Sequence, residues 1–326
     1  MPPARLIADA PERTAIEAID AITDAFADRY DAMLRLRPAR DAFQSEGRAR
    51  MRALIRPFVA TNRPIEMVLP GFALKNPNRD KTLGPLPDRA EQAALGHLER
   101  FCEAISAVYH PIGHATGCRL TLVADGRVWG DLLGVDPARV AAYGAGLRAM
   151  ARDSRHLCIV GLEALVDPPT AAALDERHER LPVGAARHDS HLALARARFR
   201  HLIDEDTRWP EALDEEERKA HADQLARDML HRHEALGVAL ARRFPNHLRL
   251  SVHAGRDEGP KYSCRFDAEP PPVGVTPVLP YHGVAVESAD GTALEVLHAD
   301  EARALPGGVT LISTPEGHPW CLRRNP

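Results

Sequence analysis

The sequence predicts an α/β protein built around a mostly parallel sheet. Short apolar runs rich in β-branched residues alternate with stretches whose apolar positions recur with helical spacing. Strands that alternate with helices in this way are typical of parallel βαβ units. The 326-residue chain contains no repeat of 20–50 residues and no low-complexity tract. We therefore predict a single α/β domain spanning residues 1–326.

The N-terminal segment, residues 1–60, is predicted to be helical, because apolar side chains recur at spacings of three and four from residue 12 onward. Pro64 interrupts that pattern. The run "IEMVLPGF" at 65–72 then predicts a short buried strand. A helix is expected over 86–109, where a proline and Asp88 stand near the start and the apolar residues share one face.

The next segments repeat the alternation of strand and helix. Residues 118–124 predict a strand that ends at an Asp-Gly turn, and a helix follows with Asp136 as N-cap and Pro137 in its first position. A third strand is expected within 155–165. Residues 170–243 are long and charged, and they predict helices that cover the sheet or form a lid. Strand patterns return near the end, at 248–254, 261–266, 283–288, 293–299 and 308–314.

Composition narrows the class of partner. A formal net charge of −4 and an aromatic content of 5% argue against nucleic-acid binding. No apolar run reaches the roughly 20 residues of a membrane helix, and the N-terminus lacks the apolar region of a signal peptide. The five cysteines include no CxxC pair. We expect a cytoplasmic protein with no membrane or nucleic-acid partner.

The strongest candidate site follows the first strand. The carboxyl end of a parallel strand is where α/β sheets bind ligands, and cations there can hold a phosphate or carboxylate. The alternative is a solvated polar loop. The stretch "KNPNRDKT" places six candidate binding residues after the strand, namely Lys75, Asn76, Asn78, Arg79, Lys81 and Thr82.

Two further segments carry candidate residues. Asp125, Arg127 and Asp131 follow the second strand, and Asp131 could pair with Arg127 or with a substrate ammonium. Turn formation explains Asp125 equally well. Near the C-terminal strands, the side chains that could close one face of a pocket are His253, Lys261 and His282. A structural role is the alternative for both histidines, which are expected at strand termini of one sheet.

Several familiar motifs are missing. The sequence contains neither GxGxxG nor GxxxxGK[ST], so a nucleotide cradle is not predicted. It contains no HExxH, no facial-triad pattern and no GxSxG. His231 and His233 differ by two positions and would point to different faces of a helix. No catalytic metal is expected.

Four stretches together resemble a known family. They are "LPGFALKNPNRDKTLGPLPDRAEQAAL", "DGRVWGDLLGVDPARVAAYGAGLRAM", "RLSVH" and "YHGVAV". The chain resembles the isonitrile (isocyanide) synthases of the pyoverdine/dityrosine biosynthesis family over about residues 60 to 290. The first two motifs are long and specific. One departure is "TPVLPYHG", which is looser than the family's proline–aromatic–His–Gly pattern.

The resemblance implies a modified Rossmann-like sheet without the dinucleotide fingerprint. It also implies an enzyme of secondary-metabolite biosynthesis that converts the α-amino group of tyrosine or tryptophan into an isonitrile. The added carbon would be C2 of ribulose 5-phosphate, used as a co-substrate, with no metal or organic cofactor. A separate iron/2-oxoglutarate oxygenase is the expected functional partner.

That chemistry requires the amine to condense with the sugar ketone, water to leave and a carbon–carbon bond to break, with general acids and bases at hand. We expect Lys75, Asp131, His253 and His282 to be catalytic, with Asp131 holding the ammonium. Substrate binding is assigned to Asn76, Asn78, Arg79, Lys81, Thr82, Asp125, Arg127 and Lys261.

The sequence is also compatible with other functions. A different sugar-phosphate lyase or isomerase could use the same cations, and a non-catalytic small-molecule binding protein could use the same pocket. The sequence does not choose between tyrosine and tryptophan, although tyrosine is preferred here. The number of subunits is also open, a homodimer being one alternative.

Overall fold

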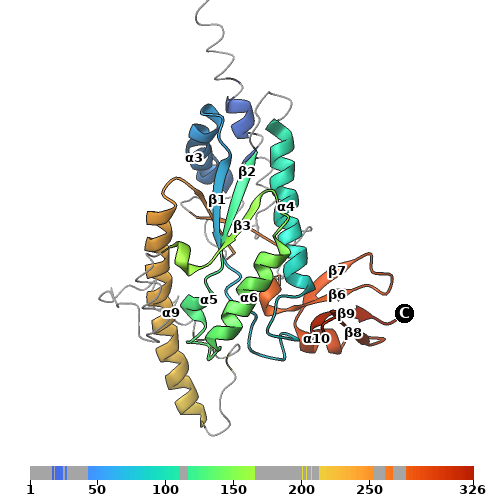
Figure 1. Ribbon diagram of the computed structural model, residues 1–326. Helices are drawn as coiled ribbons and strands as arrows, with labels where there is room; N and C mark the ends of the chain where they lie inside the picture. The colour runs from blue at the N-terminus through green and yellow to red at the C-terminus, as the bar shows by residue number, and fades with distance from the viewer. Residues whose placement is uncertain are drawn as a thin grey trace, which may run out of the picture.

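The computed structural model describes residues 17, 19–24, 26–27, 43–109, 117–165, 200, 203, 207, 213–252, 261–266 and 277–326. Within these residues, nine strands form a five-stranded sheet and a four-stranded sheet (Figure 1). In the same part of the chain, no helix is long and apolar enough to cross a bilayer.

The five-stranded sheet confirms the predicted α/β class. Its order is β3-β2-β1-β4-β5, and every pairing is parallel. This is the Rossmann order, in which β1 lies at the centre and the winding reverses between β1 and β4. The bounds are β1 Ile65–Pro70, β2 Cys118–Val123, β3 Leu157–Val160, β4 Leu248–Ser251 and β5 Lys261–Ser263.

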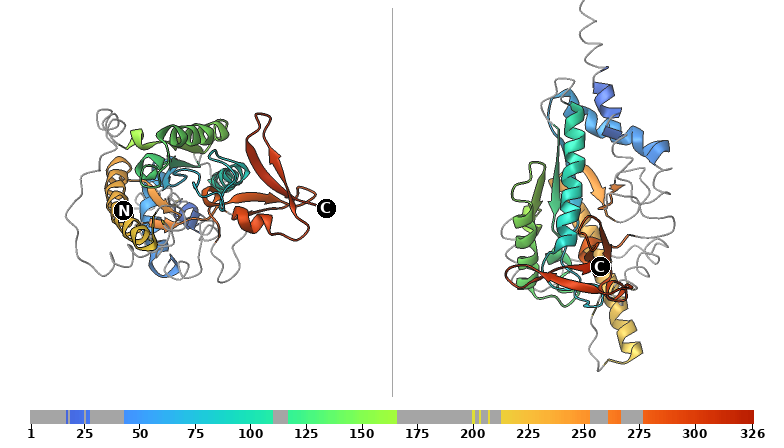
Figure 2. Two further views of the ribbon diagram at one scale, coloured as in Figure 1. Left: turned by 90° about the horizontal axis from the view of Figure 1, so that it is seen from below. Right: turned by 90° about the vertical axis from the view of Figure 1, so that its right-hand side faces the viewer.

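Helices cover both faces of this sheet (Figures 1 and 2). Alternate residues of β1 face opposite layers. Leu69 joins a large core built with helices α3, α4 and α6, whereas Val68 packs with Leu236 and Leu240 of α9. The bounds are η1 Phe43–Gly47, α3 Arg48–Ala60, α4 Arg89–Tyr109, α6 Pro137–Met150 and α9 Glu215–Arg243.

Helix starts follow their sequence signals. The Asp136 side chain accepts a hydrogen bond from the Ala138 amide at 2.6 Å, and Pro137 opens α6, as predicted. Asp214 and Glu217 form a reciprocal capping box at the start of α9. Helix α9 therefore provides part of the predicted cover over 170–243, while residues 170–199 lie outside the described part of the chain.

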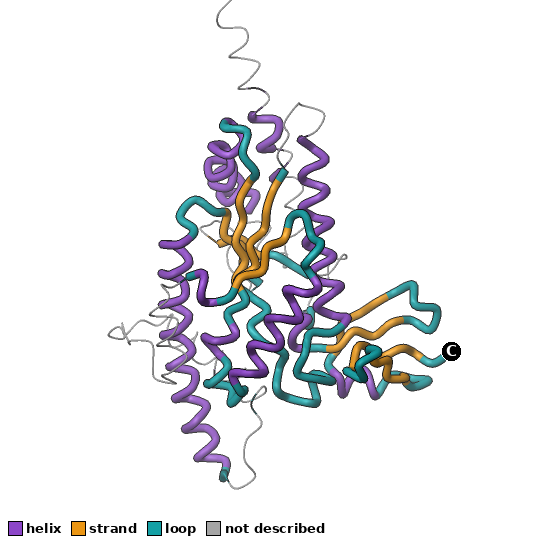
Figure 3. Tube along the Cα trace, viewed as in Figure 1, coloured by secondary structure: helices purple, strands orange, loops and turns teal. Residues whose placement is uncertain are grey.

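The C-terminal strands form a separate mixed sheet of order β7-β6-β9-β8 beside α4 (Figure 3). Arg89 Nε at the start of α4 lies 3.2 Å from Glu287 Oε1 on β6. The strands expected next to His253 and His282 do not share one sheet, because β6 pairs with β7 and β9 rather than with β4. The bounds are β6 Val284–Glu287, β7 Leu294–Leu297, α10 Ala299–Arg303, β8 Val309–Ser313 and β9 Pro319–Arg324.

Candidate active site

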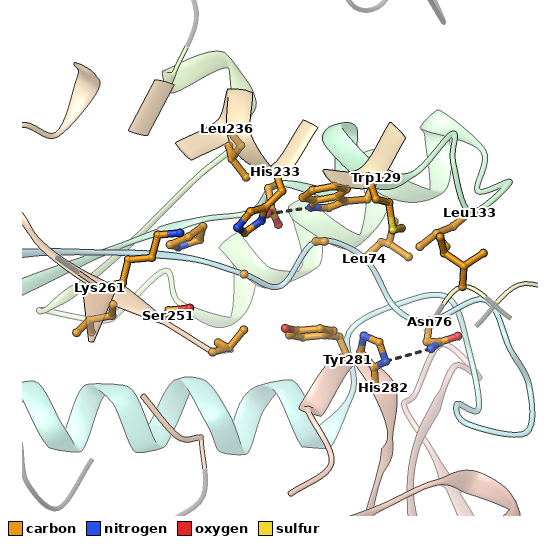
Figure 4. A pocket seen from close by; sticks show the side chains of 18 of the residues that line it. Leu74, Asn76, Trp129, Leu133, His233, Leu236, Ser251, Lys261, Tyr281 and His282 are labelled. Atoms are coloured by element: carbon orange, nitrogen blue, oxygen red, sulfur yellow. Dashed lines mark hydrogen bonds between the residues drawn. The ribbon is translucent and has the colours of Figure 1, made fainter. Parts of the chain in front are cut away.

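A cavity of about 160 Å³ lies where the carboxyl ends of β1 and β4 meet (Figure 4). The winding of the sheet reverses here, and the crevice that such a reversal leaves is the usual ligand site of α/β sheets. The wall comes from the segments after β1 and β2, from β4 and β5, from α9 and from the 3₁₀ turn η4, Pro280–His282.

The segment after β1 leaves the sheet through an unusual backbone turn. Phe72 has φ +56°, which bulky residues seldom adopt. Its ring packs 4.9 Å from the Phe266 ring and 5.7 Å from the Tyr281 ring, so aromatic contacts hold it there. Beyond this turn, Leu74 and Asn76 line the cavity. Packing therefore compensates backbone strain at the site.

Asp125 is the buried carboxyl group of the cavity. It follows β2 and precedes the short helix α5, Gly126–Trp129. Its Oδ2 accepts a hydrogen bond from Trp129 Nε1 at 3.0 Å, whereas Oδ1 has no hydrogen-bond partner among the described residues. Burial raises the pKa of Asp125 to about 6, against the opposing hydrogen bond from Trp129. A buried carboxyl oxygen without a partner is suited to accept a hydrogen bond from a ligand.

Gly126 allows the loops after β1 and β2 to approach each other. A Cβ built at this position would lie 1.9 Å from the Ala73 carbonyl oxygen. Only glycine permits that approach without moving the backbone. The Asp-Gly pair was predicted as a turn, and the structure shows that it also fixes Asp125 beside the segment that leaves β1.

An imidazole and an indole form the upper wall in Figure 4. The ring centroids of Trp129 and His233 lie 6.5 Å apart. Burial lowers the pKa of His233 to about 4, assisted by the nearby charges of Lys261 and Arg249. His233 is therefore neutral near pH 7. Apolar side chains complete this part of the wall, namely Leu133, Ile203, Met229 and Leu236.

His282 reaches the cavity from η4, opposite α9 (Figure 4). Its Nδ1 lies 3.2 Å from Asn76 Nδ2. The Asn76 Oδ1 accepts the Asn78 amide at 2.8 Å, which turns the NH₂ group toward His282. Because that NH₂ group can only donate, Nδ1 of His282 is the acceptor and the ring proton lies on Nε2. Asn76 thus sets the tautomer of a cavity histidine.

Lys75 lies outside the cavity lining. Its fully buried ammonium group is 2.9 Å from Asp88 Oδ2, 2.9 Å from Glu91 Oε2 and 2.9 Å from the Pro280 carbonyl oxygen. Burial opposes the charge, but the two carboxylates outweigh it and raise the pKa of Lys75. The structure therefore assigns Lys75 to a buried ion cluster that anchors η4, rather than to the surface of the cavity.

The rest of the predicted cation cluster is also dispersed. Arg79 is exposed, and neither Arg79 nor Lys81 lines the cavity. Thr82 Oγ1 donates to the Asn76 carbonyl oxygen at 2.8 Å, and the Ala299 amide donates to the Lys81 carbonyl oxygen at 3.2 Å. These bonds shape the loop and attach it to α10. Lys75, Arg79 and Lys81 are therefore not brought together around one ligand.

Asp131 is paired with a residue that the sequence did not indicate. Its carboxylate forms a bidentate contact with Arg232 of α9, at 2.5 and 2.7 Å. The expected partner, Arg127, is exposed and lines a second cavity of about 340 Å³ beside β3. Neither Asp131 nor Arg127 lines the cavity between β1 and β4. His253 lies outside the described residues.

Four of the predicted site residues do line one cavity, namely Asn76, Asp125, Lys261 and His282. Sequence reasoning missed four others, namely Trp129, His233, Arg249 and Tyr281. One signal for Arg249 was available, because "LRLS" places a charge inside a strand of a parallel sheet that is covered on both faces. Among the described residues, no group of three or more His, Cys, Asp or Glu side chains could hold a metal ion.

Comparison with known proteins adds independent evidence. The family model described as "Pyoverdine/dityrosine biosynthesis protein" matches residues 55–207 and 171–305. The chain is 30% identical over 278 residues to the L-tyrosine isonitrile synthase of Pseudomonas aeruginosa, covering 80% of each protein. It is also 30% identical over 207 residues to an L-tryptophan isonitrile synthase of Fischerella ambigua, covering 60% of this chain and 61% of the relative.

A solved structure matches the fold as well. The crystal structure of the PvcA protein from Pseudomonas aeruginosa superposes with a TM-score of 0.78 at 25% sequence identity. The match covers 93% of this chain and 100% of the other. The likeness therefore includes the described sheets as well as the motifs of the sequence.

Proposed function

The chain belongs to the pyoverdine/dityrosine biosynthesis protein family, and from this premise we propose that it is an isonitrile synthase. The proposed reaction is of the lyase type, converts the α-amino group of an aromatic L-amino acid into an isonitrile, and takes the new carbon from C2 of ribulose 5-phosphate. Tyrosine is the proposed preferred substrate. The relatives include an L-tyrosine isonitrile synthase and an L-tryptophan isonitrile synthase, so tryptophan is the alternative substrate.

The observation that carries the proposal is the buried, half-paired carboxyl group of Asp125 in the cavity between β1 and β4. An amino-acid ammonium group would donate to its Oδ1, which has no hydrogen-bond partner among the described residues. The two opposite charges would compensate each other's desolvation. Asp125 replaces Asp131 as the proposed ammonium ligand, because Asp131 is engaged by Arg232.

The apolar wall provides room for an aromatic side chain. Trp129 can stack on a ring, and Leu133, Met229 and Leu236 offer further apolar surface. A pocket with an apolar lining and a few polar groups fixes both the position and the orientation of its ligand. The amino group would be held by Asp125 while the ring lies against α5 and α9.

The first step requires a free amine beside a ketone. Asp125, with a pKa of about 6, can take the ammonium proton when the substrate amine attacks C2. The attack forms a carbinolamine, and loss of its hydroxyl group as water gives the imine. His282 carries its proton on Nε2 and is proposed to donate it to that leaving hydroxyl group. His233 is neutral because burial lowers its pKa, so it adds no charge to this part of the cavity.

The test uses ribulose 5-phosphate labelled with ¹³C at C2. The purified protein is incubated with this sugar and with tyrosine and tryptophan in competition, and the products are separated and examined by mass spectrometry and ¹³C NMR. We expect a labelled isonitrile derived mainly from tyrosine. Consumption of the sugar without an amino acid would instead indicate another sugar-phosphate enzyme, and ligand binding without any product would indicate a non-catalytic binding protein.

A further inference from the structure

Two cations face each other across neighbouring strands in the wall of the cavity. Arg249 of β4 and Lys261 of β5 are partners in the parallel register, and both line the cavity. Neighbouring strands lie about 4.8 Å apart, so the two side chains leave the sheet side by side. Two like charges at that separation repel each other. The arrangement costs folding free energy and requires a physical reason.

The surroundings do not neutralise this pair. No carboxylate among the described residues forms an ion pair with either side chain, and the buried Nε of Arg249 has no hydrogen-bond partner among those residues. The Nη1 of Arg249 donates to the Gly237 carbonyl oxygen at a long 3.4 Å. Burial and the charge of Arg249 lower the pKa of Lys261. The site therefore holds excess positive charge and unused donors.

We propose that Arg249 and Lys261 form the subsite for the phosphate group of the phosphorylated ketose. This inference rests on the proposed function and replaces the loop cations Lys75, Arg79 and Lys81 as the phosphate ligands. A phosphate ester near pH 7 carries close to two negative charges, which matches two cations. Guanidinium forms paired hydrogen bonds to phosphate oxygens, and ammonium adds a point charge.

The position within the sheet suits this substrate. Asp125 follows β2, and Arg249 lies on β4, two strands away, so roughly 10 Å separates the strand positions. The ketone carbon of ribulose 5-phosphate must meet the amine held by Asp125, while its phosphate is at the far end of the carbon chain. Figure 4 shows Lys261 extending toward His233, which places a cation and a neutral imidazole on the far side of the cavity from Asn76.

The test measures binding rather than turnover. Dissociation constants for ribulose 5-phosphate, unphosphorylated ribulose and tyrosine are determined by calorimetry for the full-length protein. The variants are R249Q/K261Q, the milder R249K, and the rival pair R79Q/K81Q. We expect R249Q/K261Q to weaken ribulose 5-phosphate binding by about 100-fold, since each charge-assisted hydrogen bond contributes about tenfold or more. R249K should give an intermediate loss, and R79Q/K81Q should stay within about twofold.

The controls separate this inference from the proposed function. Tyrosine binding should be unchanged in R249Q/K261Q, and wild-type protein should bind ribulose as weakly as the variant binds ribulose 5-phosphate. The inference is overturned if R79Q/K81Q carries the loss, or if the R249Q/K261Q loss falls on tyrosine, which would assign the cations to its carboxylate. Isonitrile formation by the wild type is scored independently. If the wild type forms the labelled isonitrile but R249Q/K261Q binds ribulose 5-phosphate as tightly as the wild type, the phosphate subsite is refuted and the proposed function is not.

Discussion

The ammonium group of Lys75 lies 3.0 Å from Oε1 and 2.9 Å from Oε2 of Glu91, and neither side chain is exposed to solvent. Tyr143 donates to the same carboxylate at 3.0 Å. Burial raises the pKa of Glu91, and the charge of Lys75 opposes this rise and favours the ionised carboxylate. The Pro280 carbonyl oxygen joins the cluster, so the pair connects the loop after β1 to η4 and positions His282.

Lys75→Met should therefore destabilise the fold before it affects chemistry. Removing the cation leaves Asp88 and Glu91 buried beside each other without a counter-charge, which costs about 3–5 kcal/mol in the free energy of unfolding. Urea denaturation at pH 7 measures this loss. Lys219→Met is the matched control, because Lys219 is exposed and, among the described residues, forms an ion pair with Glu215 alone, one helical turn away. It should leave the denaturation midpoint unchanged, and an equally stable K75M protein would refute the structural role.

Asp125→Asn should abolish amine recognition without loss of stability near pH 8. The folded pKa of Asp125 is raised to about 6 from 3.8, so between these values the folded state binds more protons than the unfolded state. Linkage then makes this group lower the stability as pH rises from about 4 to about 6. Over two pH units the loss in unfolding free energy reaches about 3 kcal/mol. The D125N variant does not show this loss, because asparagine does not titrate.

Measurement of the unfolding free energy from pH 4 to pH 8 checks whether Asp125 lowers the stability as the pH rises. The wild type should lose stability relative to D125N as the pH rises through this window, while its kcat/KM for tyrosine rises with a midpoint near pH 6. Asp131→Asn changes a carboxylate outside the cavity lining, so this variant should show the same rise of kcat/KM near pH 6 as the wild type. A D125N protein with wild-type kcat/KM would rule out Asp125 as the ammonium ligand.

The indole of Trp129 should set the pH at which kcat/KM rises. Its hydrogen bond at 3.0 Å stabilises the ionised form of Asp125 and lowers the pKa of that carboxyl group. In W129F the bond is lost, and the midpoint of kcat/KM against pH should move upward by about one unit, the equivalent of one hydrogen bond. Trp320→Phe, on β9, is the matched indole control. A downward shift in W129F would contradict the assignment.

Asn76→Asp should change the protonation of His282. The carboxylate accepts where the amide donated, so Nδ1 of His282 would have to carry a proton. We expect the ¹⁵N shifts of the ring to report that change and kcat to fall by about 10² or more, the usual contribution of a placed proton donor. Asn78→Asp is the control, because its Oδ1 accepts the Asp80 amide at 2.9 Å and an aspartate can still do so. An unchanged tautomer in N76D would refute the argument.

Local patterns were sufficient to predict most of the described fold. The strand at 65–72 is β1, Ile65–Pro70, and the N-cap at Asp136 is confirmed at atomic level. The division into two sheets was not predicted, because a strand pattern indicates which residues face a core but not which strand is the neighbour. Neither β9 nor the short helix α10 had been expected.

The site was harder to predict than the fold, because the sequence shows which residues are charged but not where their side chains point. "LKNPNR" suggested a cluster of cations, yet Lys75 points to Asp88 and Glu91 on the side of α4, while Arg79 is exposed. These carboxylates are 13 and 16 positions along the chain, and their convergence depends on how α4 packs. The spacing of His231 and His233 predicts no shared site for the two residues, although a single histidine such as His233 suffices to line a cavity.

The most direct test of the central claim is a crystal structure with tyrosine and ribitol 5-phosphate bound together. Ribitol 5-phosphate has a hydroxyl group in place of the ketone, so the amine cannot condense with it. We predict the tyrosine nitrogen within hydrogen-bond distance of Asp125 Oδ1, the sugar C2 beside that nitrogen, and the phosphate against Arg249 and Lys261. Electron density for both ligands elsewhere, with the cavity between β1 and β4 holding only water, would contradict the account.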